Sequence, residues 1–138
     1  MVLLTSKKSG QNGTSKLQLL FDTNVIIDFL KGKNTNIDLS QLFLHYDCSV
    51  SVITKLELLK YPAITPDEED IINEFLKLVS IIPMNTAIEN ETIVLSRSSK
   101  LKLPDAIIGA TAIVYDAELV TNDPHFLECR YNKLHIRV

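Results

Sequence analysis

The stretch LQLLFDTNVIIDFLKG, residues 17–32, decides the fold class. Its first part, 17–21, is an almost continuous apolar run, which is typical of a strand buried on both faces of a parallel sheet. Asp22 ends that run, and the apolar residues after it are arranged as in a short helix that Gly32 would end. The stretch therefore predicts a buried strand followed directly by a helix.

The rest of the chain repeats this alternation of short apolar runs and helical patterns. Further strands are predicted at 48–52, 80–84, 118–120 and 133–137. Helices are predicted at 37–46, 54–61, 65–79, 87–99 and 103–116. Strands that alternate with helices form βαβ units. The sequence therefore predicts an α/β fold, a three-layer α/β/α sandwich with a mainly parallel central sheet.

Length and composition are those of an ordinary globular chain. The 138 residues suit one domain, and 46% hydrophobic with 22% charged residues is a typical balance. Residues 5–16 are polar and show no periodicity, so we expect a flexible polar leader over 1–16 and a single domain over 17–138.

Charge and apolar patterning limit the function classes. The net charge of -3 provides no basic field over the whole molecule, although a locally basic rim remains open. No apolar run approaches the length of a membrane span or a signal-peptide core, so we expect a cytoplasmic protein with no membrane partner. Cys48 and Cys129 belong to no CxxC pair, which predicts free thiols in a reducing compartment.

Four carboxylates lie where apolar runs give way to helix-start signals: Asp22, Glu57, Asp105 and Asp123. Singly, each has a structural explanation. Asp22 can cap the helix that follows it, and Asp105 lies in a first helical turn, where the helix dipole favours negative charge. Asp123 begins an Asp-Pro turn. Glu57 would complete a capping box with Thr54, in which its carboxylate accepts a hydrogen bond from the Thr54 backbone N–H.

Together, the four carboxylates predict a metal site. The carboxyl ends of parallel strands meet at one edge of a sheet, so the acids would gather there and repel one another. A hard divalent cation such as Mg2+ or Mn2+ offsets that repulsion and prefers oxygen ligands. Because such ions activate water, hydrolysis of a phosphodiester is the first function to consider.

Four motifs resemble those of the PIN-domain ribonucleases, in particular the VapC-type toxins of toxin–antitoxin pairs. They are DTNVIIDFL at 22–30, SVITKLELL at 51–59, LSRSSKLKLPDAIIGATA at 95–112 and LVTNDPHF at 119–126. The resemblance implies metal-dependent endonucleolytic cleavage of RNA that leaves the phosphate on the 5′ side of the downstream product. It also implies an acidic quartet that binds Mg2+ or Mn2+, made of Asp22, Glu57, Asp105 and Asp123, with Asn24 and Thr121 as polar supports.

One position departs from the family pattern. Many relatives carry a further acid where this chain has His125, so His125 is expected on a turn or facing the substrate. An acidic site that cleaves RNA needs nearby cations to hold phosphates. Arg97, Lys100 and Lys102 form the densest basic run, and they are the RNA-binding candidates. Lys31, Lys33, Lys55 and Lys60 are weaker candidates, because a solvated surface charge explains each of them.

The resemblance also implies partners: an antitoxin protein held in a groove between helices of the first half, and a second copy in a homodimer. Two other readings stay open. The chain could be a housekeeping RNA-processing PIN nuclease without an antitoxin, or a catalytically silent PIN-like binding module.

Overall fold

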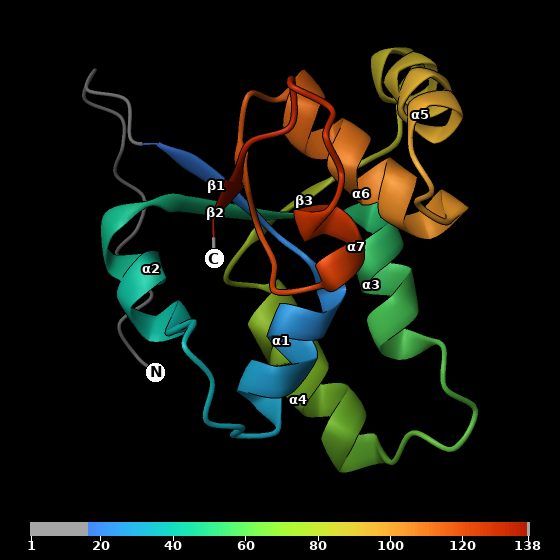
Figure 1. Ribbon diagram of the computed structural model, residues 1–138. Coiled ribbons are helices and arrows are strands. Elements are labelled where there is room, and N and C mark those ends of the chain that lie inside the picture. Colours follow the sequence, from blue (N-terminus) through green and yellow to red (C-terminus); the bar gives the residue numbers. More distant parts are fainter. Residues whose placement is uncertain (1–16, 138) are drawn as a thin grey trace.

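A parallel sheet forms the centre of the fold in the computed structural model, which describes residues 17–137 (Figure 1). Its five strands are β1 (Gln18–Phe21), β2 (Asp47–Ser51), β3 (Ser80–Ile82), β4 (Glu118–Val120) and β5 (Ile136–Arg137). Their order across the sheet is β3-β2-β1-β4-β5, and every neighbouring pair runs parallel. The first of these five strands in sequence order is therefore the central strand of the sheet. The leader predicted over 1–16 lies outside the described residues.

Seven helices surround the sheet within the described residues. They are α1 (Thr23–Leu30), α2 (Leu39–His45), α3 (Val52–Leu59), α4 (Pro66–Leu76), α5 (Thr86–Ser98), α6 (Leu103–Val114) and α7 (Pro124–Leu127). The one-turn helix α7 was not predicted from the sequence. No helix in this part of the chain is long and apolar enough to cross a membrane.

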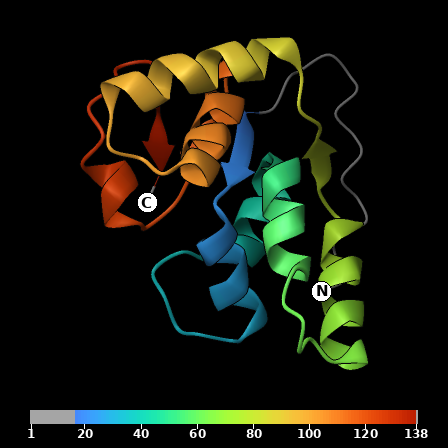
Figure 2. The same ribbon diagram turned by 90° about the vertical axis from the view of Figure 1, so that its right-hand side faces the viewer.

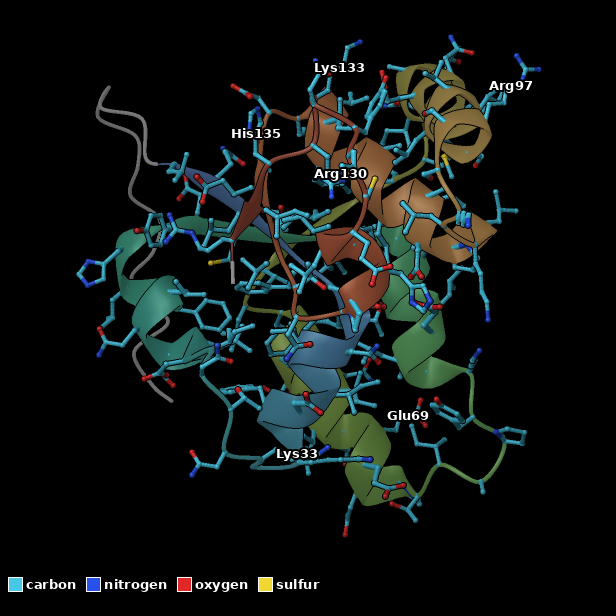
Figure 3. The ribbon with its side chains drawn as sticks, in the orientation of Figure 1. Lys33, Glu69, Arg97, Arg130, Lys133 and His135 are labelled. Atoms are coloured by element: carbon cyan, nitrogen blue, oxygen red, sulfur yellow. The ribbon has the colours of Figure 1, made fainter. Side chains whose placement is uncertain are left out.

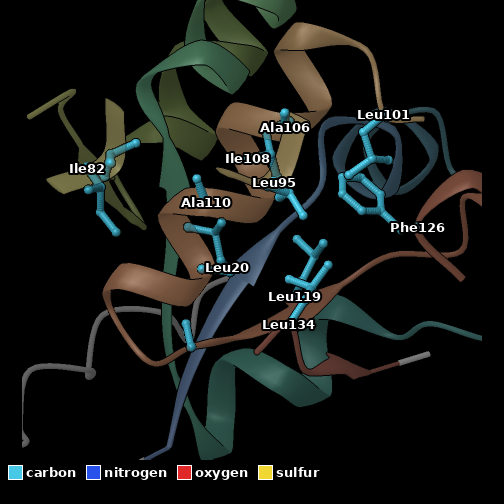
Figure 4. Packing of buried hydrophobic residues seen from close by; sticks show 13 residues of the cluster. Leu20, Ile82, Leu95, Leu101, Ala106, Ile108, Ala110, Leu119, Phe126 and Leu134 are labelled. Atoms are coloured by element: carbon cyan, nitrogen blue, oxygen red, sulfur yellow. The ribbon is translucent and has the colours of Figure 1, made fainter. Parts of the chain in front are cut away.

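The two faces of the sheet bury two separate apolar cores. Side chains alternate along a strand, so Leu20 packs on one face of β1 and Phe21 on the other. The Leu20 face is covered by α5, α6 and α7, and the Phe21 face by α1, α2, α3 and α4 (Figures 1 and 2). Figure 4 shows Leu20 and Leu119 of the sheet against the small residues of α6. The predicted three-layer α/β/α sandwich is confirmed.

Small residues on α6 bring it close to α5 rather than only to the sheet, as the turned view shows (Figure 2). Gly109 has no side chain, and a Cβ atom built there would lie 2.9 Å from Leu95 Cδ2 of α5. That distance is shorter than van der Waals contact, so the space of the missing Cβ is already taken. Leu95 is itself completely buried, and this packing holds the middle of α6 against α5.

Helix starts decide where the acidic side chains project. Helix α4 begins with a capping box: Thr65 Oγ1 accepts from Glu68 N, and Glu68 Oε1 accepts from Thr65 N. The box predicted for Thr54 and Glu57 is wrong. Helix α3 begins earlier, with Ser51 as the N-cap that accepts a hydrogen bond from Ile53 N at 3.1 Å. Glu57 therefore lies beyond the first turn of α3 and is free for another contact.

Replacing Leu20 tests the central position of β1. Because Leu20 has 0% exposure in the core, Leu20→Ala should lower the free energy of unfolding by about 2–5 kcal/mol. Leu44 on α2 is 54% exposed, so the matched change Leu44→Ala should cost much less. Urea unfolding measures both, and equal losses for the two variants would contradict this account of the core.

Candidate functional site

The carboxyl ends of β1 and β4 place two polar side chains side by side. Asp22 follows β1 and Thr121 follows β4, and the Asp22 backbone N–H donates to Val120 O across the two strands. Asp22 is only 2% exposed, and Thr121 is completely buried. The Thr121 hydroxyl donates to Asp22 Oδ2 at 2.7 Å. Asp22 occupies the N-cap position of α1 but makes no side-chain capping bond, so its carboxylate is held by Thr121 instead.

Thr121 also connects this carboxylate to Asp123. Its hydroxyl oxygen accepts from the Asp123 backbone N–H at 3.0 Å. Asp123 in turn caps α7, since its Oδ1 accepts from His125 N at 2.9 Å. The imidazole Nδ1 of His125 lies 3.1 Å from the same oxygen. The side chain of His125 is 71% exposed, whereas that of Asp123 is 16% exposed. One hydroxyl thus joins the Asp22 carboxylate to the backbone of Asp123 in the β4–α7 turn.

A second group of threonines holds Glu57, and this group was not predicted from the sequence. Thr23, the residue after Asp22, donates its hydroxyl hydrogen bond to Glu57 Oε1 at 2.7 Å. The Thr23 hydroxyl also lies 2.9 Å from Thr54 Oγ1, and both threonines are buried. The sequence signals were a threonine directly after Asp22 and another three residues before Glu57. The mistaken capping box had assigned Thr54 another role.

Asp105 completes the group electrostatically. It lies in the first turn of α6 and is partly buried. Burial raises the pKa of Asp105, and the negative charges of Asp123 and Glu57 raise it further. The positive charges of His125 and Lys102 act in the opposite direction on the pKa of Asp105. The carboxylates of Glu57 on α3 and of Asp123 at the N-cap of α7 therefore both act on Asp105.

Burial raises the pKa of Asp22 to about 6, far from its ordinary value of 3.8. The Thr121 hydrogen bond lowers this pKa, and the charges of Asp105 and Asp123 raise it again. Together with the link from Asp105 to Glu57, these interactions bring all four predicted carboxylates into one electrostatic group at the carboxyl edge of the sheet.

The sequence and fold match a known family. The family model described as the PIN domain matches residues 19–130, a span that includes all four carboxylates and the three threonines around them. This chain belongs to the PIN domain family. PIN domains are nucleases, and so hydrolases acting on nucleic acid. No curated protein matches the chain.

Several solved structures are similar to this chain over most of its length. A toxin–antitoxin complex from Klebsiella pneumoniae contains a chain of 30% identity and TM-score 0.68, over 86% of this chain and 99% of that chain. VapBC2 from Rickettsia felis, bound to a promoter DNA fragment, is similar in fold at 18% identity and TM-score 0.73, over 88% and 98% of the two chains. DNA-bound VapBC from Salmonella typhimurium gives 21% identity and TM-score 0.73, over 88% and 97%.

The donor chemistry of the PIN domain suits a hydrated cation better than one fully caged by protein. Among residues 17–137, no three His, Cys, Asp or Glu side chains are grouped closely enough to hold one metal ion. Mg2+, however, usually keeps several waters and takes only one or two carboxylates directly. Four oxygen-bearing side chains whose charges repel one another fit that mode of binding.

The structure separates the predicted supporting residues. Asn24 is exposed on α1, and its side chain makes no hydrogen bond to another residue in the described part of the chain. Lys102 occupies the N-cap position of α6, and its charge reaches Asp105. Arg97 lies at the end of α5 and projects outward (Figure 3), while Lys100 is exposed in the connection to α6. Of the three basic candidates, Lys102 is the one whose charge is felt in the acidic group.

The raised pKa of Asp22 predicts a stability that changes with pH. Because the folded-state pKa of about 6 exceeds the ordinary 3.8, the folded protein binds this proton more tightly than the unfolded chain. Stability should fall as pH rises from about 4 to 6, by up to about 3 kcal/mol. Asp22→Asn removes this penalty, so the variant should melt at a higher temperature than the parent protein at pH 7.5, but not at pH 4.

Thermal melts in chelator, from pH 4 to 8, measure this effect without bound cations. Asp70→Asn changes an exposed carboxylate on α4 and serves as the control with little expected effect. A stability difference between Asp22→Asn and the parent protein that stays constant with pH would contradict the prediction.

Proposed function

We propose that this PIN domain is a metal-dependent endoribonuclease and the toxin of a type II toxin–antitoxin system. The observation that carries the proposal is the electrostatic group formed by Asp22, Glu57, Asp105 and Asp123 at the carboxyl edge of the sheet. Two buried hydroxyl groups hold the carboxylates of Asp22 and Glu57 in place. This arrangement suits cation binding better than helix capping, because Asp123 is the only one of the four acids whose side chain makes a capping hydrogen bond in the described residues.

The four carboxylates would hold Mg2+ or Mn2+, with water completing the coordination. When bound, such an ion activates water and stabilises the negative charge that develops on a phosphate. Thr121 donates to Asp22 Oδ2, and His125 engages Asp123 Oδ1. The Thr23 backbone also hydrogen-bonds the Asp22 carboxylate, so the orientation of both carboxylates is set before a cation binds.

The remaining side chains suit contact with a phosphate backbone. Lys102 and His125 flank Asp105, and both partly offset its negative charge. In the reaction, a water oxygen bonds to phosphorus while the bond from phosphorus to the 3′ oxygen breaks. The 3′ oxygen takes up a proton, so the products are a 3′ hydroxyl and a 5′ phosphate. Lys102 would hold the phosphate during this exchange by charge, with no dependence on base identity.

An apolar groove provides a place for the antitoxin. It has a volume of about 510 Å3 and lies between α1, α3 and α4, lined mainly by Ile27, Leu30, Leu58, Tyr61, Ile71 and Ile72, with Lys31 and Glu68 among the polar lining residues. Tyr61 and Ile71 remain more than half exposed, which is costly unless a partner covers them. We infer that an apolar helix of the antitoxin binds here, a proposal supported by the toxin–antitoxin complexes among the similar structures.

Further parts of the proposal are a cytoplasmic location and a homodimer. Exposed apolar residues outside the groove, among them Ile93 and Val94 on α5, offer a surface that a second copy could cover.

Removal of single carboxylates tests the catalytic proposal. Asp22→Asn and Asp105→Asn should each reduce RNA cleavage by at least about 100-fold, because partners one step removed from a metal already change activity by about 10- to 100-fold. Cleavage is measured on a labelled single-stranded RNA with Mg2+ or Mn2+. Induced expression of the parent protein without an antitoxin should arrest bacterial growth, and neither variant should do so.

Asp70→Asn is the matched control, an exposed Asp on α4 outside the acidic group, and should cleave like the parent protein. Full cleavage in excess chelator would contradict the metal mechanism. Cleavage without growth arrest would favour the RNA-processing nuclease instead.

A charge placed in the groove tests the antitoxin site. Ile71 lines the groove and is 53% exposed, so Ile71→Asp should leave RNA cleavage intact while weakening antitoxin binding by at least about tenfold, through a buried and unpaired charge. Leu44→Asp, at a similarly exposed site on α2, is the control. Titration calorimetry with the protein encoded by the adjacent gene gives the affinity, and equal affinities for both variants would exclude the groove.

A further inference from the structure

We propose that Thr54 and Thr23 form a directed pair of hydroxyl groups that positions Glu57 for cation binding. This inference rests on the proposed function, and it adds two positioning residues that neither the acidic pattern nor the family resemblance identifies. It stands on the contacts of Thr23, in the first turn of α1, with Thr54 and Glu57 of α3.

The direction of the hydrogen bonds follows from the protons available. An ionised carboxylate has no proton to donate, so the 2.7 Å contact with Glu57 Oε1 uses the single hydroxyl proton of Thr23. The 2.9 Å contact between Thr23 and Thr54 must then use the proton of Thr54. The chain therefore runs from Thr54 to Thr23 to Glu57, and each hydroxyl in it has one role.

Burial makes this arrangement specific. Thr54 is completely buried and Thr23 is nearly so, whereas Glu57 is only partly buried. No water competes freely for the two hydroxyl groups, and a donor committed to a charged acceptor forms a strong bond. A Glu side chain has several rotamers, and this bond selects one of them. Glu57 Oε2 has no hydrogen-bond partner among residues 17–137 and remains available as a ligand.

The position of Thr23 couples two acids. Thr23 follows Asp22 directly in the chain, so the hydrogen bond to Glu57 ties the carboxylate on α3 to the backbone that carries Asp22. Thr121 fixes Asp22 from the other side. The relative position of the Asp22 and Glu57 carboxylates is therefore set by threonines rather than by the carboxylates themselves. Fixed spacing is what a small cation with strict geometry requires.

Titration calorimetry of Mn2+ into the full-length, metal-free protein tests this inference with a readout other than cleavage. Thr23→Val keeps the shape of the side chain and removes the donor, and should weaken Mn2+ binding about tenfold, as for other partners of metal ligands. Thr23→Ser restores the hydroxyl and should bind Mn2+ almost as tightly as the parent protein. Thr54→Val should cause a smaller loss, because Thr23 keeps its proton for Glu57.

Two comparisons separate positioning from general damage. Thr111 is a buried threonine on α6 whose hydroxyl donates to Ile107 O, so Thr111→Val should lose some thermal stability but no Mn2+ affinity. In a Glu57→Gln background, Thr23→Val should cost little further affinity, because the two changes act through one contact.

The failure of this inference differs from the failure of the proposed function. A parent protein that neither binds Mn2+ nor cleaves RNA overturns the proposed function and this inference with it. If the parent protein does both, equal Mn2+ affinity in Thr23→Val, or an equal loss in Thr111→Val, overturns the positioning role alone.

Discussion

A carboxylate kept almost entirely out of water at the end of the central strand sets the conditions for everything around it. Burial opposes the charge of Asp22, and the nearby Asp105 and Asp123 oppose it further, while only the Thr121 hydrogen bond and the adjacent backbone favour it. A fold has little reason to maintain such a group for stability alone. The surrounding structure reflects this: a buried hydroxyl directed at Asp22, a second set directed at Glu57, and cationic side chains beside Asp105. The site concentrates negative charge that Lys102 and His125 offset only in part.

The fold could be predicted because each of its signals is local. Buried parallel strands are apolar runs, and α4 begins with a capping box and a proline that need no tertiary information. The start of α3 could not be predicted in this way. Ser51 and Thr54 are both good caps, and the choice depends on where β2 stops pairing with β3, at Ser51 opposite Ile82. The bond from Thr23 to Glu57 depends on how α1 meets α3. The outward projection of Arg97 depends on the rotation of α5 about its axis (Figure 3). The sequence indicated the four acids and, through the family resemblance, Thr121, but not the hydroxyl groups of Thr23 and Thr54 beside Glu57.

Structural and chemical roles overlap unevenly among the four carboxylates. Asp123 caps α7 and belongs to the acidic group, so its loss affects a helix as well as the site. Asp22 has no capping bond, and its charge is a cost to the fold. Substitutions at Asp22 and at Asp123 therefore have different effects on stability. Substitutions that remove the buried charge of Asp22 stabilise the folded state. Such opposition between stability and activity is common, and only selection for function would keep the acid there.

The strand order has a consequence for the protein while it is being made. The central strand β1 is synthesised first, but its neighbour β4 comes about a hundred residues later, and the hydrogen bond from Thr121 to Asp22 spans 99 positions. A ribosome that has reached Lys100 has produced Asp22 and Glu57 but neither Asp105 nor Asp123. The acidic group is complete only after the residues around β4 have been translated. A product that ended between Glu57 and Asp105 would lack half of the group, so the order of strands ties the assembly of the site to the synthesis of the later part of this domain.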